Sequence, residues 1–309
     1  MSDREARLDQ IREEALRGAV DGAGLHADGG PQPVGYYGLP VLKPPVWTWE
    51  VPVYFFVGGA AGGAAMLASA FEAFSTDWEC ARDARWIAFG LASLSPPLLI
   101  SDLGRPERFY NMFRVFKWQS PMSVGSWALG AFGGFSAASV AAHQAAAWIP
   151  SLRFVAHAAS VGAALSGAVV ATYTGVLLGA TAIPAWSSHA TFLPVHFGVA
   201  GMGSAVGLLE LAGNNAPGLQ ALGIATSAVE TVLAVIAEGD ADPAVKGLLL
   251  RAGGLLCGPV SLGLRLLGRG SRWSRVAAGV AFTSGALLSR FGWIEAGRVS
   301  ARDPEAVLK

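Results

Sequence analysis

Charged side chains are scarce in this sequence. Asp, Glu, Lys and Arg make up 14% of the 309 residues and hydrophobic residues make up 52%, and the mean hydropathy is +0.44. A water-soluble domain of this size is less apolar than this. The composition therefore indicates a protein that lies in a lipid bilayer.

Residues that ligate metals are also few. The two cysteines, Cys80 and Cys257, are too few for an iron–sulfur cluster, which usually takes four, and they have no zinc-type spacing. Among the five histidines, His143 and His157 could face each other across one loop and hold a haem. The favoured interpretation is two histidines at a wet interface, so we expect no bound metal or haem in this chain.

We expect no secretory signal peptide, because no apolar core follows the first charges. Residues 1–46 begin with a charged, partly periodic run and continue with a stretch rich in Gly and Pro, which predicts a polar, partly extended N-terminal segment. We expect residues 47–298 to form the membrane domain, whose first span directs insertion, and residues 299–309 to form a short polar tail.

Long apolar windows are abundant. A helix that crosses the hydrocarbon needs roughly 20 mostly apolar residues. Eight such windows occur, at about 52–74, 84–103, 122–144, 154–182, 190–212, 218–238, 246–267 and 276–296. Because backbone groups in lipid must bond internally, and because these windows are too long for barrel strands, the spans are helices. The predicted fold is all-α: a polytopic membrane bundle of about eight transmembrane helices.

Glycines inside the windows predict close helix packing. Gly58 and Gly62, like Gly59 and Gly63, repeat at a one-turn spacing that lets two helix backbones approach. We interpret these glycines as packing positions rather than as a phosphate-binding loop.

An even number of spans places both termini on one side of the membrane, which we call the terminal face. Lys and Arg near the span ends number about eight on this face and about seven on the opposite face. This difference is too small for the positive-inside rule to assign a compartment.

Polar side chains within the windows gather toward the terminal face, as judged from a rise of about 1.5 Å per helical residue. They are Glu50, Tyr54, Asp102, Tyr173, His196, Glu230, Arg251 and Arg290. Ionisable groups inside a membrane are costly and mark functional sites. The first five offer the hydrogen bonds and proton acceptors that a quinone head group needs. Glu72 and Glu210 are expected at the opposite rim, in reach of water.

The remaining three residues of that set, Glu230, Arg251 and Arg290, are predicted to form a buried ion-paired group, because an unpaired charge at this depth would be neutralised or excluded. Such a group would either carry protons or only hold the last three spans together. The sequence leaves both interpretations open.

A charged run, residues 101–113, follows the second window directly. Pro106 suits the first turn of a helix, and the apolar residues after it recur at helical spacing. This predicts a short interfacial amphipathic helix between the second and third spans, with a plain interfacial connector as the alternative. We expect Asp102 and Arg105 to point inward. The residues expected to face a partner are Glu107, Arg108 and Arg114.

Four stretches carry a resemblance to a known family: "YYGLPVLKPPVWTWEVPVYFFVGGAAGGAAMLA", "DLGRPERFYNMFRVFKWQSPMSVGSWAL", "YTGVLLGATAIPAW" and "SGALLSRFGWIEAGRVSARDP". From about residue 36 to residue 304 the chain resembles the NrfD/polysulfide-reductase (PsrC-like) membrane-subunit family. The "LGRPERF…SPMSVGSW" block is the most specific element of this resemblance.

The resemblance implies an anchor of eight to ten helices that exchanges electrons and protons with menaquinone or ubiquinone and holds no metal itself. Its partner would be a four-cluster iron–sulfur subunit, often joined by a molybdopterin catalytic subunit. The location implied is a bacterial inner membrane, with both termini on the periplasmic side. Beyond these subunits and membrane lipid, we expect no nucleic-acid partner.

Residue by residue, the resemblance supports positions that stand in matching motifs, namely Asp102, Arg105, Pro106, Arg108 and Tyr173. At the start of the first span some members of the family place Asn and His to hold the quinone. This chain departs from them there, with Glu50, Val51 and Tyr54.

Two other functional classes stay open. A cytochrome b type anchor would carry haem, and a transporter or ion-translocating module would need a water-accessible route through the membrane midplane. No convincing internal repeat is present, and the polar residues are expected in one half of the membrane only. The predicted function is therefore a membrane anchor subunit of an iron–sulfur oxidoreductase complex, of the molybdoenzyme type.

Overall fold

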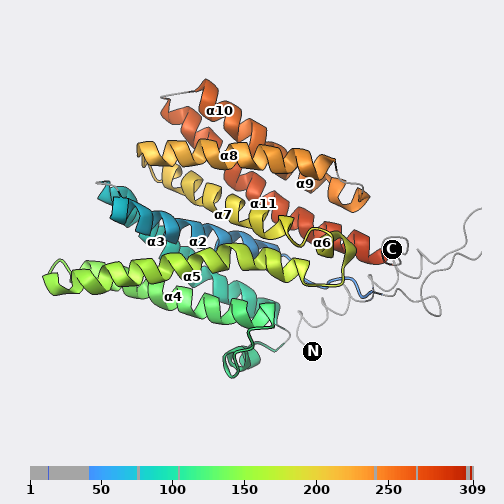
Figure 1. The fold of residues 1–309 in the computed structure, drawn as a ribbon, viewed down its shortest axis with the longest axis horizontal. Helices are drawn as coiled ribbons and strands as arrows, with labels where there is room; N and C mark the ends of the chain where they lie inside the picture. Colours follow the sequence, from blue (N-terminus) through green and yellow to red (C-terminus); the bar gives the residue numbers. More distant parts are fainter. Residues whose placement is uncertain are drawn as a thin grey trace, which may run out of the picture.

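The computed structural model shows a bundle of long helices (Figure 1). The structure describes residues 13, 42–74, 77–103, 105–239, 242–268, 271–303 and 307, and these residues form no strand. The predicted N-terminal segment lies almost wholly outside the described residues. Its described end, residues 42–46, has neither helix nor strand, and the first long helix begins four residues later at Glu50.

The first group of helices consists of α2 (Glu50–Phe74), α3 (Trp78–Asp102), α4 (Pro121–Ala145) and α5 (Arg153–Gly179). Within it α2 packs against α3 and α5, and α4 packs against α3 and α5. Between α3 and α4 lies the 3₁₀ helix η2 (Pro106–Phe113), and a short turn, η3 (Pro150–Leu152), precedes α5.

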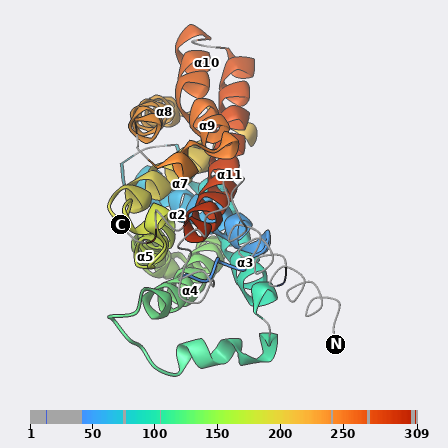
Figure 2. The same ribbon diagram turned by 90° about the vertical axis from the view of Figure 1, so that its right-hand side faces the viewer.

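The second group consists of α7 (Phe192–Leu211), α8 (Pro217–Glu238), a broken helix and α11 (Arg272–Arg302). The broken helix comprises α9 (Leu248–Leu255), the π-helical turn η5 (Leu256–Val260) and α10 (Ser261–Leu267). Short α6 (Pro184–Ser187) and η4 (Pro243–Lys246) connect these helices at the terminal face. The two groups meet where α2 contacts α7 and α11, as the end view shows (Figure 2).

Several helix boundaries follow from local chemistry. Asp77 caps α3 by accepting a hydrogen bond from the Cys80 N–H at 3.2 Å, and Ser120 and Ser271 accept similar bonds at the starts of α4 and α11. Proline occupies the first turn of α4 and α8, where its missing N–H costs nothing. Inside the broken helix Pro259 cannot donate the ordinary helical hydrogen bond, and the backbone widens there into the π turn.

Glycines set the closest helix crossings, as predicted. A Cβ added at Gly62 would overlap the backbone of Gly167 on α5, and one at Gly63 would lie 2.7 Å from the carbonyl oxygen of Gly201 on α7. The backbone of α2 therefore touches α5 on one side and α7 on the other, which makes α2 the central helix.

Each of the eight apolar windows coincides with one of the long helices. Six of these helices are long and apolar enough to cross a membrane, and counting α3 with η2 as one bent span raises the number to seven. The all-helical membrane fold is confirmed, whereas the count of about eight spans is not. The two helices that fall short alone, α3 and α11, carry several charged residues in their sequences.

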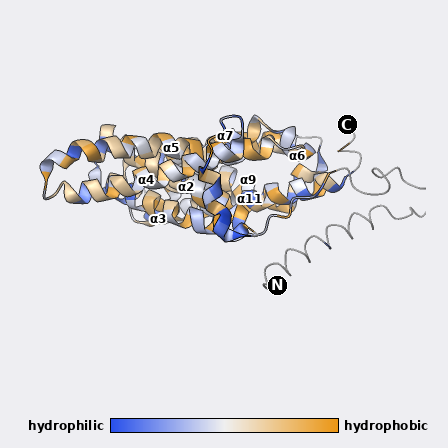
Figure 3. Cartoon of the chain, turned by 90° about the horizontal axis from the view of Figure 1, so that it is seen from below, coloured by the Kyte–Doolittle hydropathy of each residue, from blue (hydrophilic) through white to orange (hydrophobic). Residues whose placement is uncertain are grey.

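Exposed apolar side chains cover the outside of the bundle. Phe154, Leu165 and Val235 are examples, with 80%, 68% and 68% of their surface exposed. Figure 3 shows such hydrophobic residues along the long helices. A surface of this kind suits lipid rather than water.

A short helix lies where the interfacial helix is predicted, but it is wound as a 3₁₀ helix rather than as an α-helix. This helix, Pro106–Phe113, contains no buried residue. Phe113 nevertheless packs edge-on against Trp127 of α4 at 5.8 Å between ring centroids. At the other end of the chain α11 continues to Arg302, so residues 299–302 are helical.

Candidate functional site

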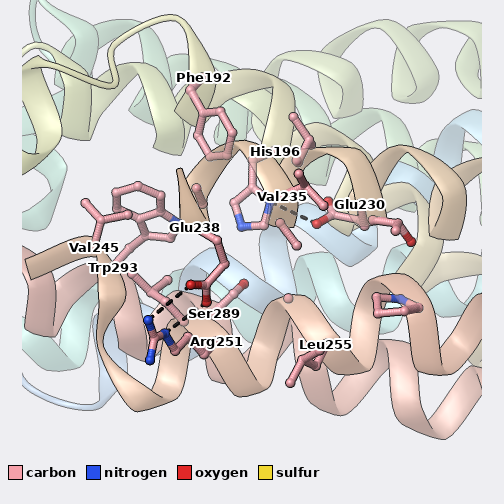
Figure 4. Close-up of a pocket in the computed structure, with 17 residues that line it drawn as sticks. Phe192, His196, Glu230, Val235, Glu238, Val245, Arg251, Leu255, Ser289 and Trp293 are labelled. Atoms are coloured by element: carbon pink, nitrogen blue, oxygen red, sulfur yellow. Dashed lines mark hydrogen bonds and ion pairs between the residues drawn. The ribbon is translucent and has the colours of Figure 1, made fainter. Parts of the chain in front are cut away.

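A cavity of about 560 Å³ lies between α7, α8, α9 and α11, in the half of the bundle nearest the terminal face (Figure 4). Most of its wall is apolar and comes from side chains such as Leu233, Val235, Leu250 and Leu255. Only a few polar groups converge on it. They are His196, Glu230, Thr231, Glu238, Arg251 and Ser289.

His196 and Glu230 form the buried polar centre of this cavity. The Nδ1 atom of His196 lies 3.0 Å from Oε2 of Glu230, and the two residues are only 6% and 1% exposed. The second carboxylate oxygen, Oε1, has no hydrogen-bond partner in the part of the chain that the structure describes. Because a buried polar atom without a partner is costly, this oxygen is ready to bind a ligand or a water molecule.

Aromatic rings hold the imidazole of His196 in place. Phe192 stacks on it at 5.7 Å between ring centroids, and Trp293 of α11 lies 6.4 Å away. Since Nδ1 is bonded to Glu230, the ring nitrogen left for a ligand is Nε2. Sequence reasoning missed both aromatic residues, although Phe192 stands one helical turn before His196 and Trp293 three residues after Arg290.

The three charges predicted to form one ion-paired group are separated in the structure. Arg251 pairs with Glu238 at 2.9 Å, and both side chains are half exposed at the mouth of the cavity. Arg290 instead donates to the Phe197 carbonyl at 3.1 Å, and its guanidinium lies 3.7 Å above the Phe197 ring. Among the described residues, no ion pair joins Glu230 to either arginine.

A second polar group lies between α2, α3 and α5. The hydroxyl of Thr48 contacts the Glu50 carboxylate and lies 3.0 Å from Oδ1 of Asp102. One turn further along α2, the hydroxyls of Tyr54 and Tyr173 are hydrogen-bonded to each other and buried. The structure thus brings together the predicted carboxylates through Thr48, a residue that sequence reasoning missed although it stands two positions before Glu50.

His196 does not join this second group. A row of aromatic rings separates them, from Tyr54 through Phe55 and Phe197 to His196, with neighbouring ring centroids 5.7–6.1 Å apart. The residues predicted to form one quinone site are therefore divided between two places on the same half of the bundle.

The charged residues around η2 lie on the surface. Arg105, at the start of η2, is exposed and does not point inward with Asp102. The residues predicted to face a partner are likewise exposed, namely Glu107, Arg108 and Arg114. In the end view η2 lies on one side of the terminal face, and α8 and α9 lie on the other (Figure 2).

The expectation that polar residues stop in one half of the membrane is wrong. Near the opposite face Arg265 donates two hydrogen bonds to Glu210, at 2.6 and 2.8 Å, and both residues are buried, at 2% and 3% exposure. Glu210 is therefore not at a wet rim. The pairing was missed because it depends on how α10 and α7 face each other, which their sequences do not reveal.

The family model described as polysulphide reductase, NrfD, matches residues 41–239, which is more than half of the chain. The chain belongs to the NrfD family. A comparison with curated proteins gives no significant match.

The family match confirms the resemblance inferred from the sequence. The NrfD match spans α2 to α8. It therefore includes the His196–Glu230 pair and the second polar group, but not the residues that α9 and α11 contribute to the cavity. Together with the six apolar helices, it identifies a multi-pass membrane protein, consistent with the anchor of a redox complex.

Proposed function

We propose that this NrfD-family protein exchanges electrons and protons between the membrane quinone pool and a partner iron–sulfur subunit of an oxidoreductase complex. The observation that carries this proposal is the apolar cavity with the buried His196–Glu230 pair in its wall. An apolar pocket with a few convergent polar groups is typical of small-molecule sites.

The residues of the cavity fit a quinone. Its flat, apolar ring system suits a wall made of aliphatic side chains and the rings of Phe192 and Trp293. The head-group oxygens need hydrogen-bond partners, and the cavity offers Nε2 of His196 and the unpaired Oε1 of Glu230. Menaquinone and ubiquinone both satisfy this chemistry.

A bound quinone supplies a two-electron, two-proton redox couple. His196 would orient a head-group oxygen through Nε2, while its Nδ1 passes a proton to or from Glu230 at 3.0 Å. Glu238 at the cavity mouth, held by its ion pair with Arg251, would exchange that proton with water at the terminal face. The apolar wall keeps bulk water away from the His196–Glu230 pair.

The second polar group is the other place where a head group could bind. The resemblance supports Asp102 and Tyr173 there, and Thr48 and Glu50 connect this group to the terminal face. In our proposal the cavity binds the head group, and the residues Glu50, Tyr54, Asp102 and Tyr173 form a separate proton-exchange group.

The arrangement in the membrane follows from the same proposal. All eight long helices would cross, including α3 and α11, so that both termini lie on one side, the periplasmic side of a bacterial inner membrane according to the resemblance. An iron–sulfur subunit of four clusters would dock on the terminal face over η2, with a molybdopterin catalytic subunit completing the complex. The exposed charges of η2, including Glu107 and Arg108, would pair with that subunit.

Binding of a short-chain quinone analogue to the purified chain in detergent tests the cavity directly. His196→Gln should weaken binding about tenfold, since one hydrogen bond to the head group contributes about 1–1.5 kcal/mol. Glu295→Gln is the matched control, because Glu295 is 57% exposed on α11. Equal affinity of His196→Gln and the unmodified protein would rule the cavity out as the head-group site.

Turnover in the assembled complex distinguishes the two polar groups. Glu230→Gln should lower quinone-linked electron transfer by about 10²-fold or more while sparing electron transfer to an artificial dye. Tyr173→Phe and Asp102→Asn should slow quinone-linked turnover without changing analogue binding. If these two variants lose analogue binding and Glu230→Gln keeps it, the head group lies in the second group instead. Equal loss of quinone and dye activities would contradict a quinone role for either group.

A further inference from the structure

A cluster of two histidines and a glutamate lies at the end of the first helix group that is opposite the terminal face. Glu72 is in the last turn of α2, His143 in the last turn of α4, and His157 near the start of α5. Oε1 of Glu72 lies 2.5 Å from Nε2 of His143 and 2.7 Å from Nδ1 of His157. Glu72 thus meets two histidines that lie more than 70 positions further along the chain, and all three ligating atoms point at one spot.

The hydrogen bonds of His143 direct the lone pair of its Nε2 at the spot beside Glu72. Its Nδ1 lies 2.8 Å from the Ser139 carbonyl oxygen, which only accepts hydrogen bonds, so Nδ1 carries a proton. Its Nε2 faces the Glu72 carboxylate, which is also an acceptor when ionised. A neutral imidazole has one proton and cannot donate to both. Either a second proton or a metal ion must lie between Nε2 and the carboxylate.

His157 points at the same carboxylate oxygen. Its Nδ1 faces Oε1 of Glu72, so two ring nitrogens converge on one carboxylate oxygen. The two rings meet edge to face with their centroids 6.0 Å apart. One divalent cation at this spot would therefore bind both nitrogens and the carboxylate at once.

We propose, contrary to the expectation that this chain binds no metal, that Glu72, His143 and His157 bind one divalent transition-metal ion of the zinc class. The ligands would be Oε1 of Glu72, Nε2 of His143 and Nδ1 of His157, whose nearest atoms all lie within 4.8 Å of one another. A tetrahedral ion with bonds of about 2.0–2.1 Å holds its ligands roughly 3.3 Å apart. Each histidine nitrogen would therefore move away from Oε1 of Glu72 by less than 1 Å, which the 60% exposed side chain of His157 can accommodate.

The surroundings resemble those of protein metal sites. The Ser139 carbonyl fixes the tautomer and orientation of His143, as a carbonyl commonly does for a histidine ligand. Arg85 lies 3.8 Å from the other carboxylate oxygen, Oε2, and orients Glu72 without occupying Oε1. The exposed His157 leaves a path for the ion and an open fourth position for water.

The donor set selects the kind of ion. Two imidazoles and one carboxylate favour zinc, cobalt, nickel or copper over magnesium and calcium, which prefer oxygen ligands. A haem does not fit, because the Glu72 carboxylate already lies in hydrogen-bond contact with both rings where a macrocycle would need space. The ion would hold α2, α4 and α5 together at their ends, and this inference is independent of the proposed quinone function.

Metal titration of the full-length chain in detergent, after removal of bound metal with a chelator, tests the site. We expect one Co²⁺ per chain with the visible absorption of a tetrahedral site, displacement by Zn²⁺, and no displacement by Mg²⁺. His143→Gln and His157→Gln should each weaken Co²⁺ affinity at least 10–100-fold. His189→Gln, which changes a histidine near the terminal face, should bind Co²⁺ as the unmodified protein does.

Stability measurements keep the result interpretable if a variant folds poorly. Zn²⁺ should raise the unfolding temperature of the unmodified chain and of His189→Gln but not that of His157→Gln, whose exposed side chain is dispensable for packing. Absence of stoichiometric Co²⁺ binding, or equal Co²⁺ affinity in His143→Gln and the unmodified chain, would overturn the proposal. The cluster would then be a protonated ion-pair group.

Discussion

At the scale of single residues, the energetic cost of each buried charge depends on the partner that it contacts. Arg265 donates two hydrogen bonds to Glu210, and both side chains are almost completely buried. Such a pair contributes little net stability compared with apolar residues, but removal of one partner leaves a buried charge without compensation.

Glu210→Gln should destabilise the protein by about 3–5 kcal/mol, because Arg265 would stay buried without its counter-charge. Thermal or denaturant unfolding in detergent measures this loss. The double variant Glu210→Leu with Arg265→Met should recover most of it. Glu238→Gln is the control, since its pair with Arg251 is half exposed and contributes at most about 1 kcal/mol. Equal effects of the two single variants would contradict the assignment.

Gly125 of α4 leaves the space in which the Tyr173 ring lies when its hydroxyl is hydrogen-bonded to Tyr54. A Cβ at this position would overlap the Tyr173 ring, whereas a Cβ at Gly134 of the same helix meets nothing within 4 Å. Gly125→Ala should therefore cost about 1–3 kcal/mol through overpacking and displace the Tyr173 hydroxyl from Tyr54. Gly134→Ala should stabilise by up to about 1 kcal/mol, the usual gain of Ala over Gly in a helix. Unfolding curves of the two variants check this difference.

At the scale of elements, the crossings of α2 hold the two helix groups together. Gly62 faces the backbone of α5, and Gly63 faces that of α7, so neither position has space for a side chain. These crossings gain backbone contacts and dispersion between closely packed atoms. Burial of apolar side chains adds little in a membrane, because lipid tails contact such side chains equally well. Small residues at these positions are thus a requirement of the fold.

Gly62→Ala should push α2 and α5 apart and destabilise the protein by more than 1 kcal/mol. The matched control is Gly90→Ala on α3, where an added Cβ meets nothing within 4 Å. Thermal unfolding in detergent compares the two variants. A stability of Gly62→Ala equal to that of Gly90→Ala would show that the α2–α5 crossing is looser than described.

At the scale of the whole molecule, the number of membrane crossings is the property to test. Length and composition support six helices, and the proposal adds α3 and α11, whose charges lower their hydropathy. Both pack against other helices of the bundle, and Arg290 of α11 is buried there at 1% exposure. A hydropathy criterion counts such a residue against a span although it faces protein rather than lipid.

Thiol labelling from one side of the membrane tests the eight-span arrangement. In a chain whose two buried cysteines are replaced by alanine, Phe74→Cys, Trp148→Cys and Trp273→Cys should react with an impermeant reagent on one side. Trp118→Cys and Asp303→Cys should react on the other. Labelling of Phe74→Cys and Trp118→Cys from the same side would exclude α3 as a span, and the same result for Trp273→Cys and Asp303→Cys would exclude α11.

The sequence by itself determined where the helices lie and which half of the bundle contains the cavity. Every apolar window is a helix because lipid forces backbone groups to bond within one segment, and the depth of His196 and Glu230 follows from the rise per residue. The family was likewise readable, because its motifs are contiguous stretches of the chain.

Only the tertiary structure decided which side chains meet. Glu230 pairs with His196 rather than with Arg251 or Arg290, and Glu72 meets two histidines from distant parts of the chain. Such contacts depend on the rotation of each helix about its axis and on which helices are neighbours. In a bundle whose helices are apolar on nearly every side, periodicity leaves that rotation undetermined, and only packing sets it.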